Sequence, residues 1–246
     1  MNYRRENLNN TIIPDDHYNY ESPVVLKDFG VTDSAKVEVC FRDIEARLVN
    51  KINQYKCVVG CVAWLTNERI LKALAKLNQV SIIVQKEDFL RPDTNPKPGW
   101  DNKLRRLYSN LSSIYRPTMP GMVQDLSTGS SEEGCDSIRC AGIYNENRKA
   151  ASPRMHHKFL VFCESKSPIL DEFGYSSNDW NYTPKEVWTG SFNLTENSTN
   201  SLENIVIISS EEIAWAYYHE WTQVLAISEP LDWTEPYVEP EWRLGT

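Results

Sequence analysis

Two chemically capable side chains stand two positions apart in the second half of the chain. His156 and Lys158 open an apolar run that ends at Cys163 and has the composition of a β-strand. Residues i and i+2 of a strand share a face and lie about 6.5 Å apart, so the imidazole and the ammonium are expected to point the same way and His157 the opposite way. An imidazole that attacks or transfers a proton, beside a cation that holds non-bridging oxygens, suits phosphoryl chemistry.

A second polar segment follows further along the chain. Residues Thr189–Thr195 read Thr-Gly-Ser-Phe-Asn-Leu-Thr, and Glu203-Asn204 comes ten residues after the asparagine. Ser191 and Asn193 are also two positions apart, so they can donate hydrogen bonds to the same oxygens. Each segment taken alone is common on strands and in turns. Their combination, in this order and each beside an apolar strand, predicts a phosphate-binding site.

The combined pattern resembles the signature of the phospholipase D superfamily, in which His-x-Lys is followed after four residues by Asp and later by Gly-Ser/Thr-x-Asn. The likeness covers roughly residues 35–226 and is greatest to the single-motif branch of bacterial phospholipase D-like nucleases. It implies an α/β sandwich with a central mixed sheet flanked by helices. It also implies roles for the motif residues: His156 as the nucleophile that becomes a phosphohistidine, Lys158, Ser191 and Asn193 as phosphate ligands, and Glu203 as the acid that orients an active-site histidine.

The sequence departs from this signature at the motif Asp. That position, five residues after Lys158, holds Cys163. Either the Asp is lost, or another acidic residue such as Glu164 serves in its place.

The spacer before Gly190 is a second departure, because it is much longer than the family's. The added residues fall in a stretch at 164–184 that the sequence predicts to be irregular. An enlarged loop beside a site often carries substrate contacts. Tyr175 and Trp180 in this stretch could stack on a base, or they could pack against the body of the protein.

The mechanism that the resemblance implies needs two histidines, one to attack phosphorus and one to protonate the leaving oxygen and then activate water. The chain's other histidines are His17, His157 and His219, and none has Lys two residues later. The second catalytic histidine is therefore expected from a symmetry mate, in a C2 homodimer whose axis passes through one composite site. Two coupled imidazoles would titrate as a pair, one neutral for attack and one protonated for donation. This mechanism requires no cofactor and no metal, and no cluster with metal-ligand spacing is evident.

The segments that must position these motifs alternate between strands and helices. Apolar spacing predicts helices over 41–52, 67–74, 100–111 and 211–225, and strands over 57–64, 80–84, 138–144, 155–163, 186–190 and 204–209. Strand alternating with helix in the first half indicates parallel βαβ pairing. We expect one catalytic domain over 35–226, an irregular N-terminal arm at 1–34 and a surface-hugging C-terminal tail at 227–246.

Composition indicates a globular chain. Of the 246 residues, 41% are hydrophobic and 24% are charged. The apolar runs are far shorter than the ~20 residues that cross a bilayer, and the polar start lacks a signal peptide. The six cysteines are expected as reduced thiols, which fits a cytoplasmic protein. The net charge is −8, of which −2 lies in residues 1–30 and −4 in 227–246, so the core is nearly neutral.

The favoured interpretation is a metal-independent, endonuclease-like phosphodiesterase that acts on nucleic acid, with DNA preferred over RNA from the resemblance alone. A phospholipase or phosphatidyltransferase is an alternative, although only the tryptophan-rich C-terminus suggests a membrane-facing surface. A non-catalytic nucleic-acid-binding module that keeps the fold is another, because the motif Asp is missing. The sequence also leaves room for a regulatory or partner protein.

Overall fold

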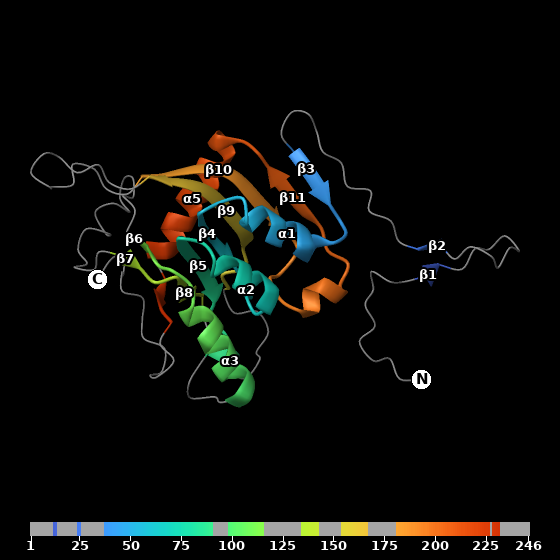
Figure 1. The fold of residues 1–246 in the computed structure, drawn as a ribbon, viewed down its shortest axis with the longest axis horizontal. Coiled ribbons are helices and arrows are strands. Elements are labelled where there is room, and N and C mark those ends of the chain that lie inside the picture. The colour runs from blue at the N-terminus through green and yellow to red at the C-terminus, as the bar shows by residue number, and fades with distance from the viewer. Residues whose placement is uncertain are drawn as a thin grey trace, which may run out of the picture.

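A mixed eight-stranded sheet lies at the centre of the computed structural model (Figure 1). The structure describes residues 12–13, 24–25, 37–90, 98–115, 134–142, 154–166, 181–226 and 228–231. In spatial order the strands are β12 (Glu229–Pro230), β8 (Ile138–Ala141), β5 (Gln79–Gln85), β4 (Cys57–Val62), β9 (Lys158–Lys166), β10 (Asn181–Gly190), β11 (Ile205–Ile208) and β3 (Val37–Cys40).

Parallel pairing is concentrated in the first half of the chain. Strand β4 pairs in parallel with β5, and β5 with β8, whereas the other neighbours in the sheet are antiparallel. Helix α2 (Glu68–Leu74) connects β4 to β5, which confirms the predicted βαβ unit. Asn67 caps this helix, because its side-chain oxygen accepts a hydrogen bond from the amide of Ile70 at 3.0 Å.

Helices cover both faces of the sheet, as the sequence predicts. Helices α1 (Ile44–Ile52), α2 and α3 (Pro98–Ser109) lie on one face, and α5 (Glu211–Ala226) lies on the other (Figure 1). Alternate residues of β4 serve the two cores: Val58 and Val62 pack with the first group, and Val59 and Cys61 pack with α5. Within the described residues, four α-helices therefore flank one sheet. None of these helices is both long and apolar enough to cross a membrane.

Strands β4 and β9 run through the middle of the molecule and approach each other closely. Every residue of β4 is buried. A Cβ atom at Gly60 would lie 2.3 Å from the carbonyl oxygen of Phe159 on β9, so only glycine fits at this position. The tight contact fixes the register of the strand that carries Lys158.

The β9–β10 hairpin is longer than the sequence predicts. The expected irregular stretch 164–184 is wrong at both ends, because β9 continues to Lys166 and β10 begins at Asn181. Pro184 suggested a break, but it lies at a register shift between Pro184 and Glu186, where a strand tolerates proline. The intervening residues, with Tyr175 and Trp180, lie outside the described part of the chain.

The two ends of the predicted domain also differ from expectation. Residues 228–231 of the expected tail belong to the fold, because β12 pairs with β8 and the buried Glu229 forms an ion pair with Lys86. The sequence does not predict the edge strand β3, because its four residues are too few for a clear alternation of apolar and polar residues. In the expected arm at 1–34, the structure describes β1 (Ile12–Ile13) and β2 (Val24–Val25), which pair antiparallel. The described residues also include the short pair β6 (Ile114–Tyr115) and β7 (Gly134–Cys135), and the single turns η2 (Asp88–Leu90) and η4 (Asn197–Asn200).

Candidate active site

The register of β4 and β9 places His156 where these two central strands end, at the C-terminal end of β4 and the N-terminal end of β9. Val62 pairs with Lys158 at the last position of β4, and the next amide, of Ala63, donates to the carbonyl oxygen of His157 at 2.9 Å. Pairing therefore continues beyond the first residue of β9. One step further, the antiparallel register sets His156 opposite Trp64, and their rings meet edge to face with centroids 6.1 Å apart.

His156 and Lys158 lie together, as their spacing predicts. The Lys158 Nζ is 3.3 Å from both ring nitrogens of His156 and 3.2 Å from its carbonyl oxygen. His157 points to the opposite face, where its Nε2 is 3.0 Å from a carboxylate oxygen of Glu220 on α5. His156 is exposed. The imidazole–ammonium pair thus forms an open surface site.

The surroundings of this pair favour its uncharged forms. Partial burial, followed by the charges of Lys158 and Arg154, lowers the pKa of His156 below its ordinary value. Burial also lowers the pKa of Lys158, against the opposing effect of the Glu203 carboxylate. A neutral imidazole is the form that can attack phosphorus. The environment of His156 therefore favours its neutral imidazole.

The second motif forms the loop between β10 and β11. A Cβ atom at Gly190 would lie 2.2 Å from the carbonyl oxygen of Asn204, which explains the glycine. The loop is closed at its base, because the Ser191 amide donates to that carbonyl at 3.0 Å and the Asn204 amide donates to the Ser191 hydroxyl at 3.1 Å. The Ser191 hydroxyl in turn donates to the carboxylate of Glu203. Ser191 and Glu203 thus meet as one unit.

Glu203 contacts Ser191 in this chain. Among the described residues, no hydrogen bond joins its carboxylate to His156, although Glu203 acts electrostatically on Lys158. The orienting role toward a histidine that the resemblance implies therefore stays a prediction.

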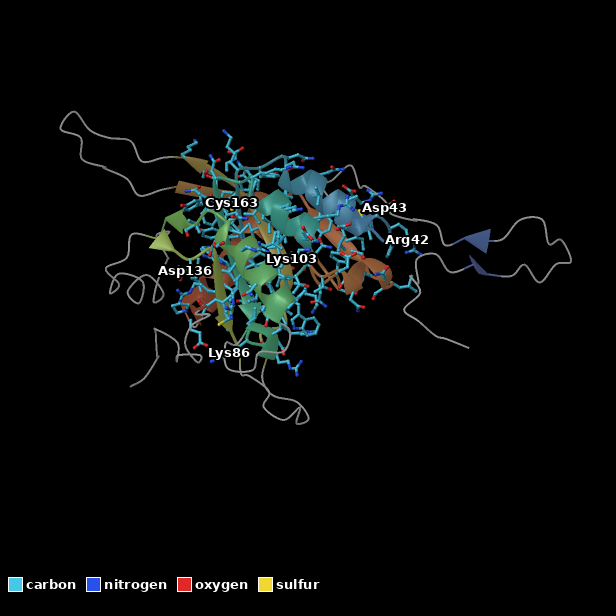
Figure 2. All side chains as sticks on the ribbon, turned by 60° about the horizontal axis from the view of Figure 1, so that its bottom comes forward. Arg42, Asp43, Lys86, Lys103, Asp136 and Cys163 are labelled. Carbon is cyan, nitrogen blue, oxygen red and sulfur yellow. The ribbon has the colours of Figure 1, made fainter. Side chains whose placement is uncertain are left out.

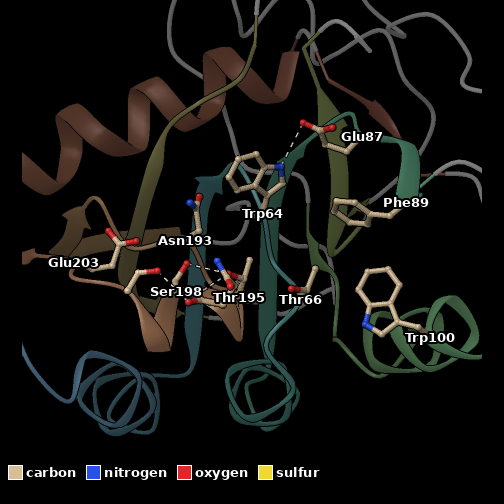
Figure 3. A pocket seen from close by; sticks show the side chains of 11 residues that line it. Trp64, Thr66, Glu87, Phe89, Trp100, Asn193, Thr195, Ser198 and Glu203 are labelled. Atoms are coloured by element: carbon tan, nitrogen blue, oxygen red, sulfur yellow. Dashed lines mark hydrogen bonds between the residues drawn. The ribbon is translucent and has the colours of Figure 1, made fainter. Parts of the chain in front are cut away.

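The far side of the same loop docks beside β4. The carbonyl oxygen of Leu194 accepts hydrogen bonds from the amides of Thr66 and Asn67 at 2.8 and 2.9 Å, and the Leu194 amide donates to Trp64. This docking holds Asn193 near Trp64, where both line one pocket (Figure 3). The Oδ1 atom of Asn193 is buried and has no hydrogen-bond partner among the described residues.

The position of the missing motif Asp lies far from this site. Cys163 is fully buried and pairs with Cys57 at the first residue of β4, whereas Lys158 pairs with the last. Five residues of strand separate Cys163 from Lys158, or roughly 16 Å. In Figure 2, Cys163 lies in the upper part of the described fold, well above Lys86, which follows the end of β5. Cys163 therefore removes no group from the site.

Glu164 does not replace the motif Asp at the site. Its carboxylate is 3.7 Å from the Nζ of Lys185, and the residue is the strand partner of Thr183 across the hairpin, remote from Lys158. That alternative from the sequence is wrong, because the side chain after Cys163 points to the exposed side of the hairpin.

Several residues near the site escaped sequence reasoning. Glu87 accepts a hydrogen bond from the indole of Trp64 at 3.4 Å and lies 3.9 Å from Arg154. Phe89 and Trp100 form an aromatic pair beside them, with centroids 5.6 Å apart. Trp64, Glu87 and Phe89 follow the ends of the paired strands β4 and β5, and Trp100 comes from the start of α3. Their positions in the sequence could have indicated them, because Trp64 and Glu87 come at or just after the ends of two predicted strands that pair in parallel, and such strands end at the same side of a sheet.

Metal-ligating side chains are not grouped at the site. Within the described ranges, no cluster of three or more His, Cys, Asp or Glu side chains could hold a metal ion. Five of the six cysteines are buried residues of the described part of the chain.

Comparisons with known proteins identify the family of this chain. A family model described as "Cardiolipin synthase, PLD-like domain" matches residues 48–224. An uncharacterized protein of Acanthamoeba polyphaga mimivirus is 33% identical over 205 residues, which cover 78% of this chain and 66% of that relative's length. Among solved structures, NucT from Helicobacter pylori aligns with a TM-score of 0.45 and 14% identity, over 79% of this chain and 98% of its own. Nuc from Salmonella typhimurium, a phospholipase D family member, aligns with a TM-score of 0.44 and 15% identity, over 78% and 95%. On the extent of the family match, this chain belongs to the phospholipase D-like domain family and has its fold.

Proposed function

We propose that this protein is a metal-independent phosphodiesterase that cleaves nucleic acid, with His156 as the nucleophile. The observation that carries the proposal is the contact between His156 and Lys158 at an exposed sheet edge, beside the loop that holds Ser191, Asn193 and Glu203. Membership of the phospholipase D-like family supports phosphodiester chemistry at these residues.

The first step of the proposed reaction is attack on phosphorus. The neutral imidazole of His156 forms a P–N bond while the P–O bond to the leaving strand breaks. Lys158 and the amide of Asn193 hold the non-bridging oxygens, where negative charge builds up in the transition state. The lowered pKa of His156 supports this role, because it favours the unprotonated form of the ring.

The second histidine is proposed to come from another copy of the chain. The leaving oxygen needs a proton, but the other described histidines face elsewhere: His157 contacts Glu220, and His219 packs against Trp215 on α5. A C2 partner would bring its own imidazole to the exposed site. The partner's His156 would protonate the leaving oxygen. It would then take a proton from the water that attacks phosphorus and breaks the P–N bond.

The buried cysteine at the motif Asp position supports an active enzyme over a binding module that has lost catalysis. Cys163 lies on the hydrophobic side of β9 that faces α5, and packs among apolar residues at the opposite end of the strand from Lys158. The residues that do line the site, His156, Lys158, Ser191, Asn193 and Glu203, are all present. Loss of the Asp therefore leaves the proposed chemistry intact.

The test is cleavage in excess EDTA of single-stranded DNA, double-stranded DNA, RNA, and vesicles of cardiolipin and phosphatidylglycerol. We expect the wild-type protein to cleave DNA in preference to RNA and to leave the lipids intact. His156→Ala should lose about 10⁴-fold or more in kcat. The matched control is His157→Ala, which removes the adjacent, oppositely directed imidazole and should keep activity.

Three results would contradict the proposal. Equal activity in His156→Ala would exclude the nucleophile. Cleavage of the vesicles alone would indicate a phospholipase. Binding of nucleic acid with no turnover of any substrate would indicate a module that has lost catalysis.

A further inference from the structure

A pocket of about 510 Å³ opens beside His156, on the far side of Trp64. Its volume falls within the roughly 300–1,000 Å³ of small-molecule sites. Four segments build it: the β4–α2 connection, the turn after β5, the start of α3 and the loop of the second motif. Eleven residues line it: Trp64, Thr66, Glu87, Phe89, Trp100, Asn193, Thr195, Asn197, Ser198, Ser201 and Glu203.

The two sides of this pocket differ in chemistry. Trp64, Phe89 and Trp100 give it flat aromatic surfaces, and Figure 3 shows Phe89 and Trp100 on one side with Asn193 and Glu203 on the other. The polar side carries amide and hydroxyl groups. A ligand that fits both sides has a flat apolar face and a hydrogen-bonding edge, which describes a nucleobase.

The charges of the lining residues agree with a base and disagree with a phosphate. No Lys or Arg is among the described residues that line the pocket, whereas Glu87 and Glu203 present carboxylates there. Carboxylates repel phosphate but accept hydrogen bonds from the amino groups of bases. The cations Lys158 and Arg154 lie next to His156 instead. Phosphate and base would thus take neighbouring places.

The buried Oδ1 of Asn193 is a second observation that points to a ligand. Within the described part of the chain this atom has no hydrogen-bond partner, although its side chain lines the pocket. Buried polar atoms without partners are rare and costly in folded proteins. A bound base edge with an N–H group would satisfy it.

From these observations we infer that the pocket binds one unstacked base of a single-stranded nucleic acid, next to the phosphodiester held at His156. The inference rests on the proposed function for the position of the phosphate. A base that is paired and stacked in a duplex cannot enter the pocket unless it is flipped out. Single strands are therefore the preferred substrate class.

Binding rather than cleavage is the direct test, measured with His156→Asn protein so that the strand is not consumed. The probes are a labelled single strand of mixed sequence, the same sequence as a blunt duplex, and a backbone of equal length made of abasic units. We expect the single strand to bind more tightly than either of the others. Trp100→Ala in the same background should weaken binding of the single strand by about fivefold or more and leave the abasic backbone unchanged.

Trp215→Ala is the matched control. Trp100 and Trp215 are both 38% exposed, and each makes one edge-to-face contact at an interplanar angle of 75°, to Phe89 and Tyr218 respectively. Trp215 lies on α5 and does not line the pocket. Its loss should leave binding of all three probes unchanged. Phe89→Leu, which removes an aromatic face at similar volume, provides a second variant should Trp100→Ala not fold.

Two results would overturn the inference. One is that Trp100→Ala weakens binding of the intact and abasic strands equally, which would show that this face contacts the sugar-phosphate backbone and not a base. The other is tight duplex binding that is indifferent to both aromatic substitutions. Failure of the proposed function is separate: base-dependent binding without any cleavage by the wild-type protein would overturn the nuclease and retain the base pocket.

Discussion

Two polar clusters lie along strands β9 and β10, and they differ in how well their charges are satisfied. The first, the Glu186 cluster, consists of Glu186, Lys51, Tyr55 and Ser209. The second, the His156 cluster, consists of His156, Lys158, Ser191, Asn193 and Glu203.

In the Glu186 cluster the carboxylate has protein partners at both oxygens. One oxygen accepts from Lys51 at 2.8 Å and from Tyr55 at 2.9 Å, and the other accepts from Ser209. Burial opposes ionisation of Glu186, but these hydrogen bonds outweigh it and hold the pKa of the carboxyl below its ordinary value. Burial and the neighbouring Glu186 raise the pKa of the Tyr55 hydroxyl, which remains protonated. This cluster joins α1 to the sheet and has no need of a ligand.

In the His156 cluster the polar groups have fewer partners among the described residues, so they could bind a ligand. Lys158 contacts the imidazole of His156, and the buried Oδ1 of Asn193 has no hydrogen-bond partner among the described residues. Burial lowers the pKa values of both His156 and Lys158. The contrast teaches that satisfied polar groups mark structural support, whereas incompletely satisfied ones mark a candidate site.

Compared with Glu186→Gln in the other cluster, Lys158→Met should have the larger effect on kcat. This change removes the cation that would hold the non-bridging oxygens, so kcat should fall by about 10²–10³-fold. Stability should not fall, because Lys158 has no carboxylate within hydrogen-bond distance among the described residues and its burial disfavours the charge. Kinetics on the preferred strand and urea unfolding check the two halves of this expectation. A marked loss of stability with normal turnover would place Lys158 among the structural residues.

Glu186→Gln should give the reverse result. It leaves the half-buried Lys51 without its counter-charge, so the free energy of unfolding should fall by about 2 kcal/mol while kcat of the folded protein is kept. The native pKa of Glu186 is lowered, so its contribution is present above the unfolded pKa and is lost as pH falls through the folded one. The stability gap to wild type should therefore close in acid. Urea unfolding at neutral and acid pH measures it, and a gap that widens in acid would refute the assignment.

The partner's contribution to the His156 cluster can be measured by mixing. If both histidines serve one composite site, protein refolded from equal amounts of wild type and His156→Ala should keep about a quarter of the wild-type activity. Independent sites would keep about half. The same mixture made with His157→Ala should keep full activity, which controls for refolding. Activity near half in the first mixture would contradict a shared site.

Arg154→Gln should give the smallest effect. Arg154 is one of the charges that lower the pKa of His156, after burial and Lys158. Removing it raises that pKa, so protonation of the nucleophile begins at a higher pH. The acidic limb of the kcat/KM profile should then move upward, with activity nearly unchanged in mild alkali. A limb that moves downward or stays in place would show that His156 is not the group that titrates there.

The sequence predicts the parts of the site that depend on local periodicity. The two-residue period places His156 with Lys158 and turns His157 away, and the structure agrees. The βαβ unit follows from apolar spacing, whereas the sandwich fold was expected from the family resemblance. Gly190 is explained by the close approach of the Asn204 backbone, which a motif can indicate but only coordinates can measure.

The remainder depends on strand pairing, which periodicity cannot supply. The local sequence does not predict that Trp64 lies opposite His156. It also does not predict that Glu87 and Phe89, which follow the neighbouring strand, lie close to Trp64. Likewise, Pro184 marks a break in any local reading, although β10 passes through it at a register shift. The sequence therefore predicts both hairpin strands shorter than they are, and it does not predict the pocket because four separate segments build it.

The covalent intermediate provides the most direct test of the central claim. Wild-type protein is mixed with excess single-stranded DNA in EDTA, quenched in alkali within one turnover, and digested for mass spectrometry. The account predicts a nucleotide fragment joined through a P–N bond to the peptide that contains His156, lost on exposure to acid and absent from His156→Ala. Efficient cleavage with no adduct on His156, or with an adduct on another residue, would contradict it.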